Sequence, residues 1–244
     1  MNTECSGRAA SAPVVTLRGA VKDYPSGGVQ QRVLRSIDLD IYESELLVIL
    51  GESGCGKTTL LNLLGGMDRL TEGSLTAFGK DLSSPAEETL TDYRRNDVGF
   101  VFQAYHLMPN LTAWENVELI AEHSADAMDS LAALELVGLD AKAGSYPFAL
   151  SAGQQQRVAI ARAIVKKPRL ILADEPTAAL DLRTGREVLK VIRDVVREQG
   201  ISVVMATHNA EIAKMADRVV RLQDGRIAEE RRAAQPLSAA ELSW

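Results

Sequence analysis

The sequence predicts an α/β protein built on a parallel β-sheet, and three observations lead to this fold class. In the second half of the chain, short apolar segments of strand length alternate with amphipathic helical segments. At residues 46–67, a glycine-rich loop separates an apolar strand from an apolar helix. The first 50 residues instead show the period-two alternation of half-buried strands. A chain of 244 residues can form one large α/β domain, or a core domain with a smaller lobe.

The N-terminal part is predicted to be rich in β-strands. Residues 14–50 contain the apolar stretches VVTLRGAV, RVLRSIDLDIY and ELLVIL, with turn signals such as YPSGG between them. The next segment, GESGCGKTTLLNLLGGM, predicts a loop followed by a helix that ends at Gly65-Gly66. This part therefore leads from a β-rich region into a strand–loop–helix unit.

Residues 85–149 predict a mainly helical lobe inserted between two α/β parts. They are rich in acidic residues, Ala and Leu, and MDSLAALELVGL carries apolar residues at helical spacing. After this lobe come a strand in RLILADEP, a helix in REVLKVIRDVVREQG that closes at Gly200, and a strand in ISVVMATH. Because strands and helices alternate, we expect these strands to join one parallel sheet.

The composition excludes several classes of protein. A net charge of -6 argues against binding to nucleic acid, which usually requires a basic face. No apolar run reaches the roughly 18 residues that span a bilayer. Residues 1–13 lack the basic and apolar regions of a signal peptide, so we expect a disordered tail and a cytoplasmic protein. Two cysteines, Cys5 and Cys55, fit a reducing compartment.

The strongest motif is a phosphate-binding loop at residues 51–58. GESGCGKT matches G-x-x-x-x-G-K-[ST] in full, directly after an apolar strand and before a helix. Gly51, Gly54 and Gly56 allow a tight backbone turn whose N–H groups point inward at the start of a helix. Lys57 would bind the β- and γ-phosphates, and the Thr58 hydroxyl would bind Mg²⁺. A glycine turn without function is the alternative interpretation.

A second candidate site follows the apolar strand LILADE at residues 170–175. A nucleotide with Mg²⁺ requires a carboxylate on a neighbouring strand, and Asp174 would orient the metal or its waters. Glu175 points differently from Asp174 and could polarise the attacking water. The alternative is that both acids only end a strand at the surface.

His208 ends the next apolar strand, ISVVMATH. In a parallel sheet it would emerge at the same carboxyl edge as Asp174, where ligands bind. A lone histidine is more often structural. Together with the two motifs above, His208 is predicted to contact the γ-phosphate or the attacking water. The other two histidines, His106 and His123, have no such context.

The stretch LSAGQQQR at residues 150–157 could bind an anion or simply cap a helix. Read with the phosphate loop and the acidic strand, LSAGQQQRVAIARA resembles the signature LSGGQ of ABC transporter nucleotide-binding subunits and the helix that follows it. The resemblance covers roughly residues 14–230. It implies a P-loop NTPase fold, with a RecA-like parallel sheet, an N-terminal antiparallel β subdomain and an inserted helical subdomain.

This resemblance implies that two copies of the chain pair head to tail around two MgATP. Ser151, Gly153 and Gln154 would then contact ATP held by the phosphate loop of the partner chain. Ala152 replaces the first glycine of the family signature, which puts the affinity of the signature in question. The resemblance also adds the remaining positions of the phosphate loop and the helix start to the nucleotide-binding residues: Ser53, Cys55 and Thr59.

Three further positions match the family residue by residue. Tyr24 is similar to the aromatic residue that stacks on adenine, although an ordinary turn tyrosine is an alternative. Gln103, in VGFVFQ, is similar to the glutamine that senses Mg²⁺ and the attacking water; a polar strand end is its alternative. Asp181, in TAALD, is similar to the residue that couples the two sites, with a helix N-cap as the rival interpretation.

The family also implies domains and partners. An ATPase domain is expected over residues 14–230, with its helical subdomain at about residues 100–160 and a C-terminal tail at 231–244. GGMDRLTEGSL, QAYHLMPNLTAWENV and ADEPTAALD are most similar to the lipoprotein-release, macrolide-export and cell-division subgroup. These subunits work with transmembrane permeases at the inner face of the cell membrane. A regulatory ATPase that signals to a membrane partner without transport remains the alternative.

Overall fold

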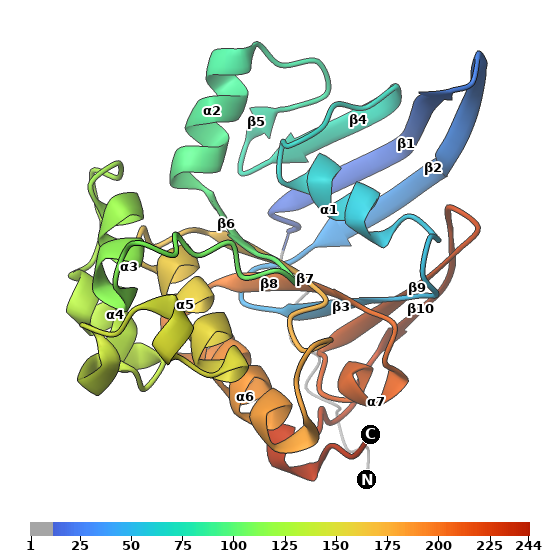
Figure 1. The fold of residues 1–244 in the computed structure, drawn as a ribbon. Coiled ribbons are helices and arrows are strands. Elements are labelled where there is room, and N and C mark those ends of the chain that lie inside the picture. The colour runs from blue at the N-terminus through green and yellow to red at the C-terminus, as the bar shows by residue number, and fades with distance from the viewer. Residues whose placement is uncertain (1–11) are drawn as a thin grey trace, which may run out of the picture.

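The structure, a computed structural model, describes residues 12–244, so the tail predicted for residues 1–13 lies almost entirely outside the described residues. Its centre is a six-stranded sheet in the order β10-β9-β3-β8-β7-β6 (Figure 1). Five strands are parallel and β10 pairs antiparallel to β9. The strands are β3 (Leu46–Leu50), β6 (Val98–Val101), β7 (Leu170–Asp174), β8 (Ser202–Thr207), β9 (Arg218–Gln223) and β10 (Arg226–Arg232). The predicted parallel sheet is confirmed.

A second sheet is antiparallel and has the order β2-β1-β4-β5. Its strands are β1 (Val15–Ser26), β2 (Val29–Ile41), β4 (Glu72–Ala77) and β5 (Lys80–Asp81). The first two belong to the predicted β-rich entry, and the other two come after the first helix, α1 (Lys57–Leu64). The N-terminal antiparallel β subdomain is thereby confirmed.

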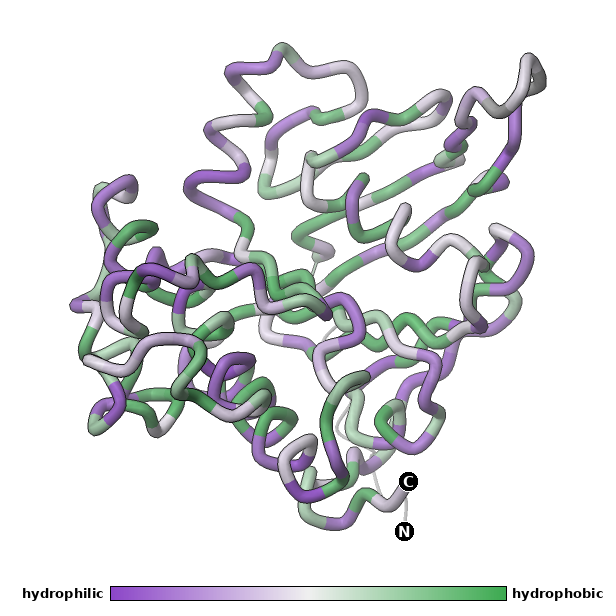
Figure 2. The backbone as a smooth tube through the Cα atoms, in the orientation of Figure 1, coloured by the Kyte–Doolittle hydropathy of each residue, from purple (hydrophilic) through white to green (hydrophobic). Residues whose placement is uncertain are grey.

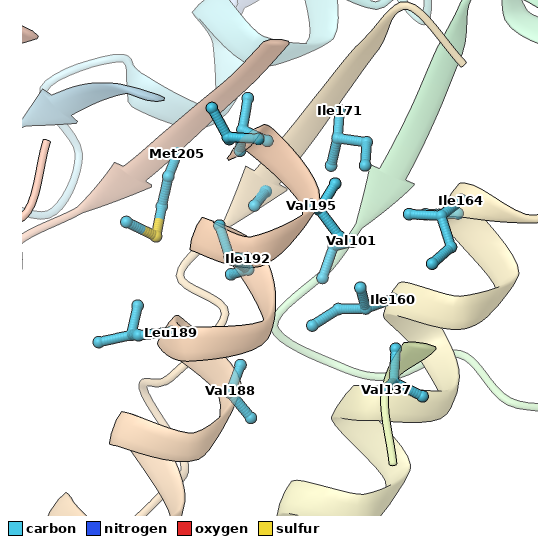
Figure 3. Packing of buried hydrophobic residues seen from close by; sticks show 14 of the residues in the cluster. Val101, Val137, Ile160, Ile164, Ile171, Val188, Leu189, Ile192, Val195 and Met205 are labelled. Carbon is cyan, nitrogen blue, oxygen red and sulfur yellow. The ribbon is translucent and has the colours of Figure 1, made fainter. Parts of the chain in front are cut away.

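The parallel sheet separates two hydrophobic cores, because alternate residues of each central strand point to opposite faces. In β7, Leu170 and Leu172 pack with α1 and the antiparallel sheet, whereas Ile171 packs on the other face. That other core is formed with the helices α3 (Ala113–Ala121), α4 (Ser130–Leu136), α5 (Ala152–Ile164), α6 (Leu182–Gln199) and α7 (Ala210–Ala213). Figure 3 shows Ile160 of α5 and Ile192 of α6 pointing toward the sheet. Each such buried aliphatic side chain contributes about 1.5–3 kcal/mol.

Residues 85–101 differ from the mainly helical lobe predicted for 85–149. Helix α2 (Glu87–Asn96) lies beside the antiparallel sheet in Figure 1, and β6 is the edge strand of the parallel sheet. The reason is that Leu90 and Tyr93 of α2 join the core of α1, where the Tyr93 hydroxyl donates to the Leu64 carbonyl at 2.8 Å. The short apolar run VGFV was too brief to distinguish a strand from a helix by its pattern.

The last residues pack against the body of the domain. Two short 3-10 helices precede α5, at Asp140–Lys142 and Pro147–Ala149, and a third, Ala239–Glu241, lies near the C-terminus.

In Figure 2 the apolar stretches concentrate along the central strands, and α2 is mostly polar. Within residues 12–244, no helix has both the length and the apolar character needed to cross a membrane.

Candidate functional site

A cleft of about 1220 Å³ opens at the carboxyl edge of the parallel sheet. The strands β3, β7 and β8 end side by side there, with Leu50 opposite Thr207 and Asp174 opposite Ala206. Ligands of α/β proteins bind at this edge. The cleft is lined by the loop after β3, by the residues after β7 and β8, and by Gln103, Asp174, Glu175, Ala178, His208 and Ala210.

The phosphate loop has the backbone that the motif requires. Gly54 and Gly56 have φ of +80° and +109°, in the left-handed region that side chains disfavour. Gly51 has no room for a side chain, because a Cβ there would lie 2.5 Å from the Leu222 carbonyl oxygen and 2.6 Å from Cys55 Sγ. Helix α1 begins directly after Gly56. The loop therefore presents its amides at a helix N-terminus, the arrangement that suits a polyphosphate.

Lys57 is buried, and its ammonium is turned back into the loop. Its Nζ donates to the carbonyls of Gly51 at 2.8 Å and Glu52 at 3.0 Å. Glu175 Oε1 lies 3.6 Å away. The charge is thus held within the phosphate loop, next to the predicted base.

Thr58 and Asp174 meet although 116 positions separate them in the sequence. The Thr58 hydroxyl donates to Asp174 Oδ2 at 2.7 Å. Burial raises the pKa of the Asp174 carboxyl, against the opposing effects of the Thr58 hydrogen bond and the Lys57 charge. A hydroxyl and a carboxylate beside the phosphate loop are the oxygen ligands that Mg²⁺ uses together with phosphate oxygens and water. These residues fit the predicted metal.

Replacement of Asp174 by asparagine is expected to stabilise the ligand-free protein and to impair its activity. A raised pKa in the folded state means that the carboxyl contributes stability below its unfolded pKa of 3.8, and that this contribution is lost as the pH rises through the folded pKa. At pH 7 the ionised Asp174 carboxylate therefore lowers the free energy of unfolding. The neutral amide of asparagine, which has the same shape, does not.

Thermal unfolding checks the first part of this prediction, since Tm should rise by about 2–4 °C for each kcal/mol recovered. The same variant should lose about 10²-fold of Mg²⁺-dependent ATP hydrolysis. Asp194→Asn, at a half-exposed position of α6 outside the cleft, serves as the control. A ligand-free Tm below that of the parent protein would contradict the role of burial.

Glu175 turns out of the strand and crosses toward β8. Its φ is +47°, unusual for a residue with a side chain, and its N–H donates to the Ala206 carbonyl at 3.0 Å. The carboxylate lies between Lys57 and His208, whose Nδ1 is 3.0 Å from Glu175 Oε1. Asp174 and Glu175 thus point to different partners, as a metal ligand and a base require.

Gln103 lines the cleft from the loop after β6. Side chains of α5 hold the backbone of this loop: Arg162 donates to the carbonyls of Tyr105 and His106 at 2.8 and 2.5 Å. The buried Gln156 reaches the Phe102 carbonyl at 3.5 Å. Sequence reasoning did not single out Gln156 or Arg162, although both lie in the quoted stretch LSAGQQQRVAIARA.

Tyr24 does not line the cleft. Its hydroxyl donates to Asp68 Oδ2 at 2.6 Å, and the Lys22 ammonium lies 4.8 Å from the centre of its ring. The proposed stacking on adenine therefore stays a prediction. The other predicted residues of this region, Ser53, Cys55 and Thr59, do line the cleft.

The signature residues lie outside the cleft of their own chain. Ser151 is the N-cap of α5: its hydroxyl accepts from the Gln154 N–H at 3.3 Å, and Gln154 Oε1 accepts from the Ser151 N–H at 2.9 Å. Asp181 is likewise the N-cap of α6 and accepts from the Thr184 N–H at 3.0 Å. Gly153 is buried, and a Cβ there would overlap the Thr184 methyl. The capping interpretations are thus realised, and contact with a second chain stays a prediction.

One wall of the cleft is basic, which the sequence analysis missed. Arg32 and Arg35 come from β2, Arg221 from β9 and Arg231 from β10. Arg32 pairs with Asp23 at 2.9 Å. Arg32 and Arg231 are far apart in the sequence, and β2 belongs to a different sheet from β9 and β10, so the packing of the two sheets brings these arginines together.

The fold and the cleft define a P-loop nucleotide-binding protein with an antiparallel β subdomain and a helical layer. The model of one family, described as ABC transporter, matches residues 34–178. The chain belongs to this family.

Relatives and solved structures agree with this assignment. The macrolide export ATP-binding/permease protein MacB 1/2 of Paracoccus denitrificans is 46% identical over 230 residues, or 92% of this chain and 34% of that protein. MacB of Agrobacterium fabrum is 42% identical over 90% of this chain and 35% of that protein. The chain spans about a third of the length of these curated relatives. The family and subgroup predicted from the sequence are confirmed.

Among solved structures, the ATP-binding cassette MJ0796 matches with a TM-score of 0.82 and 38% identity, over 89% of this chain and 98% of that one. That structure is a dimer in a post-hydrolysis state bound to ADP and Pi. It supports the predicted nucleotide-binding fold.

Proposed function

We propose that the chain binds MgATP in the cleft and hydrolyses it as a head-to-tail homodimer, to drive transmembrane permease segments of an export system. One observation carries the proposal. The phosphate loop, Asp174, Glu175 and His208 gather in one cleft, while Ser151 and Asp181 lie outside it on the same chain. Each site is therefore completed by a second copy, and a single chain alone is nearly inactive.

The residues of the cleft divide the work of phosphoryl transfer. The loop amides and Lys57 bind the phosphates, and Thr58, Asp174 and Gln103 would hold Mg²⁺, which neutralises developing charge on the phosphate oxygens. Water attacks the γ-phosphorus, the bond to the bridging oxygen breaks, and ADP departs. Glu175 accepts the proton of that water. His208 is placed to fix the orientation of the Glu175 carboxylate, since the two are 3.0 Å apart.

The partner chain supplies the remaining contacts. Ser151 and the amides of Gly153 and Gln154 stand at the start of α5, where the helix dipole favours the charge of a γ-phosphate. Tyr24 of the chain whose phosphate loop holds the nucleotide stacks on adenine after moving from its contact with Asp68. Asp181 links the two sites across the interface.

Mixed dimers test this composite site. Lys57→Ala damages the phosphate loop and leaves the signature intact; Ser151→Arg blocks the signature and leaves the phosphate loop intact. Each variant alone should be inactive. A mixture contains dimers with one site built from two undamaged halves, and it should recover about a quarter of the parent activity, since half of the dimers are mixed and each has one of two sites. A mixture that stays inactive would contradict the shared site.

The permease is expected to dock on the loop that begins at Tyr105 and on Trp114 in the first turn of α3, which follows this loop. Met108 and Trp114 expose 47% and 40% of their surface, although both are large and apolar. The relatives named above are ATP-binding/permease proteins, which supports a transmembrane partner. The chain would then work in the cytoplasm, at the inner face of the cell membrane.

Replacement of Trp114 by aspartate should separate the ATPase from its membrane partner. A charge in an apolar contact of this kind is expected to reduce recovery of the multi-spanning partner from detergent extracts by about 10-fold or more. The ATPase rate of the chain alone should stay unchanged, because Trp114 does not line the cleft. Leu131→Asp is the matched control, since Leu131 of α4 is 47% exposed outside this loop. Equal recovery with both variants would contradict the docking site.

A further inference from the structure

The C-terminal segment, residues 233–244, follows a fixed path over the protein. The Ala233 N–H donates to the Asp217 carbonyl and the Leu237 N–H to the Lys214 carbonyl, both at 3.0 Å. Leu242 is fully buried in the core that contains α6. Figure 1 shows this red segment crossing beside the lower end of α6. The segment predicted as a C-terminal tail is therefore part of the packed domain.

The segment ends against the first turns of α6. Arg186 donates to the Leu242 carbonyl, with Nε at 2.9 Å. A Cβ at Gly185 would lie 2.8 Å from Trp244 Cζ2 and 3.8 Å from Thr177 Cβ. Only glycine leaves this space, so the indole packs on the helix backbone. Thr177, which is buried beside it, belongs to the loop that leads from Glu175 to Asp181.

The same turn of α6 also contacts the signature. Thr184 donates to Asp181 through its N–H at 3.0 Å and its hydroxyl at 2.8 Å. Its methyl fills the space that a side chain at Gly153 would occupy. The first turns of α6 therefore lie against Trp244 at Gly185 and against the signature turn at Thr184.

We infer that Leu242 and Trp244 are positioning residues that fix Asp181 and the signature turn for contact with a second copy of the chain. This inference rests on the proposed function. A surface that is already rigid loses less conformational freedom when a dimer forms, and so binds more tightly. Trp244 does not line the cleft that contains Lys57 and Thr58. It should therefore affect the signature that a chain donates to its partner and not the phosphate loop of its own chain.

The mixed dimers described above give the sharpest test. Their single working site takes its signature from the Lys57→Ala chain and its phosphate loop from the Ser151→Arg chain. Adding Trp244→Ala to the Lys57→Ala chain should lower the activity by about 10-fold, because that chain donates the working signature. The same change in the Ser151→Arg chain should have little effect. Equal losses in both positions would overturn the inference, since a general structural role predicts them.

Two further variants separate a positioning role from a general loss of stability, and the mixture without any Trp244 change separates failure of the inference from failure of the proposed function. Trp244→Phe should restore the activity, and Leu131→Ala, which removes an exposed apolar side chain of α4, should leave it unchanged. Full activity with Trp244→Ala in the Lys57→Ala chain would overturn the inference. If the mixture without any Trp244 change is inactive, the composite site itself fails, and the inference falls with it.

Discussion

Replacing Glu175 by glutamine is expected to lower ATP hydrolysis by about 10³-fold, within the range for loss of a general base. Glutamine has nearly the same shape and keeps a hydrogen-bonding oxygen for His208, but it cannot accept a proton from water. The binding groups of the phosphate loop remain. The variant should therefore hold MgATP without turning it over, and two chains should stay paired around it.

Size-exclusion chromatography with excess MgATP checks this expectation: Glu175→Gln should elute as a dimer, and the parent protein mostly as a monomer after turnover. Glu198→Gln, at the exposed end of α6, should behave like the parent. Adding Ser151→Arg to Glu175→Gln should abolish the dimer, because the signature contact is lost. A Glu175→Gln protein that stays monomeric with saturating MgATP would count against the head-to-tail arrangement.

The sequence predicted the parts of this protein that depend on local pattern. The strands β7 and β8 were expected from apolar runs, and their buried residues do alternate between two cores. The phosphate loop follows from the spacing of three glycines, Lys57 and Thr58, since the backbone turn allows few other residues. The meeting of Asp174 and Thr58 follows from parallel pairing of strands, which brings the ends of β3, β7 and β8 to one edge.

The remaining features depend on contacts between distant segments. The basic wall requires β2, β9 and β10 to meet at the cleft, and no local pattern encodes that meeting. Packing of Trp244 on Gly185 joins the last residue to the start of a helix 59 positions earlier. The prediction placed residues 85–101, which include helix α2, in the helical lobe. The amphipathic pattern of α2 does not show that its apolar side packs in the core of α1 and the antiparallel sheet. Strand order and core choice are tertiary properties, which periodicity alone cannot supply.

Of the residues that line the cleft, Lys57 is expected to contribute most to the affinity for nucleotide. Its ammonium already lies in the phosphate loop, so only a rotation of the side chain separates the carbonyls of Gly51 and Glu52 from a bound phosphate. Hydrogen bonds to charged groups contribute about 1.5–3 kcal/mol each. Lys57→Ala should therefore weaken MgATP binding by about 10- to 100-fold.

Isothermal titration with MgATP measures this loss, and thermal unfolding without nucleotide provides a second result. The variant leaves two inward-facing carbonyls without their donor and the Glu175 carboxylate without a nearby positive charge, so Tm should also fall. Lys190→Ala, which removes an exposed lysine paired with Asp194 on α6, should change neither quantity appreciably. Unchanged MgATP affinity in Lys57→Ala would exclude a contact between this ammonium and the phosphates. Lower affinity at an unchanged Tm would show that Lys57 binds the nucleotide and does not stabilise the ligand-free protein.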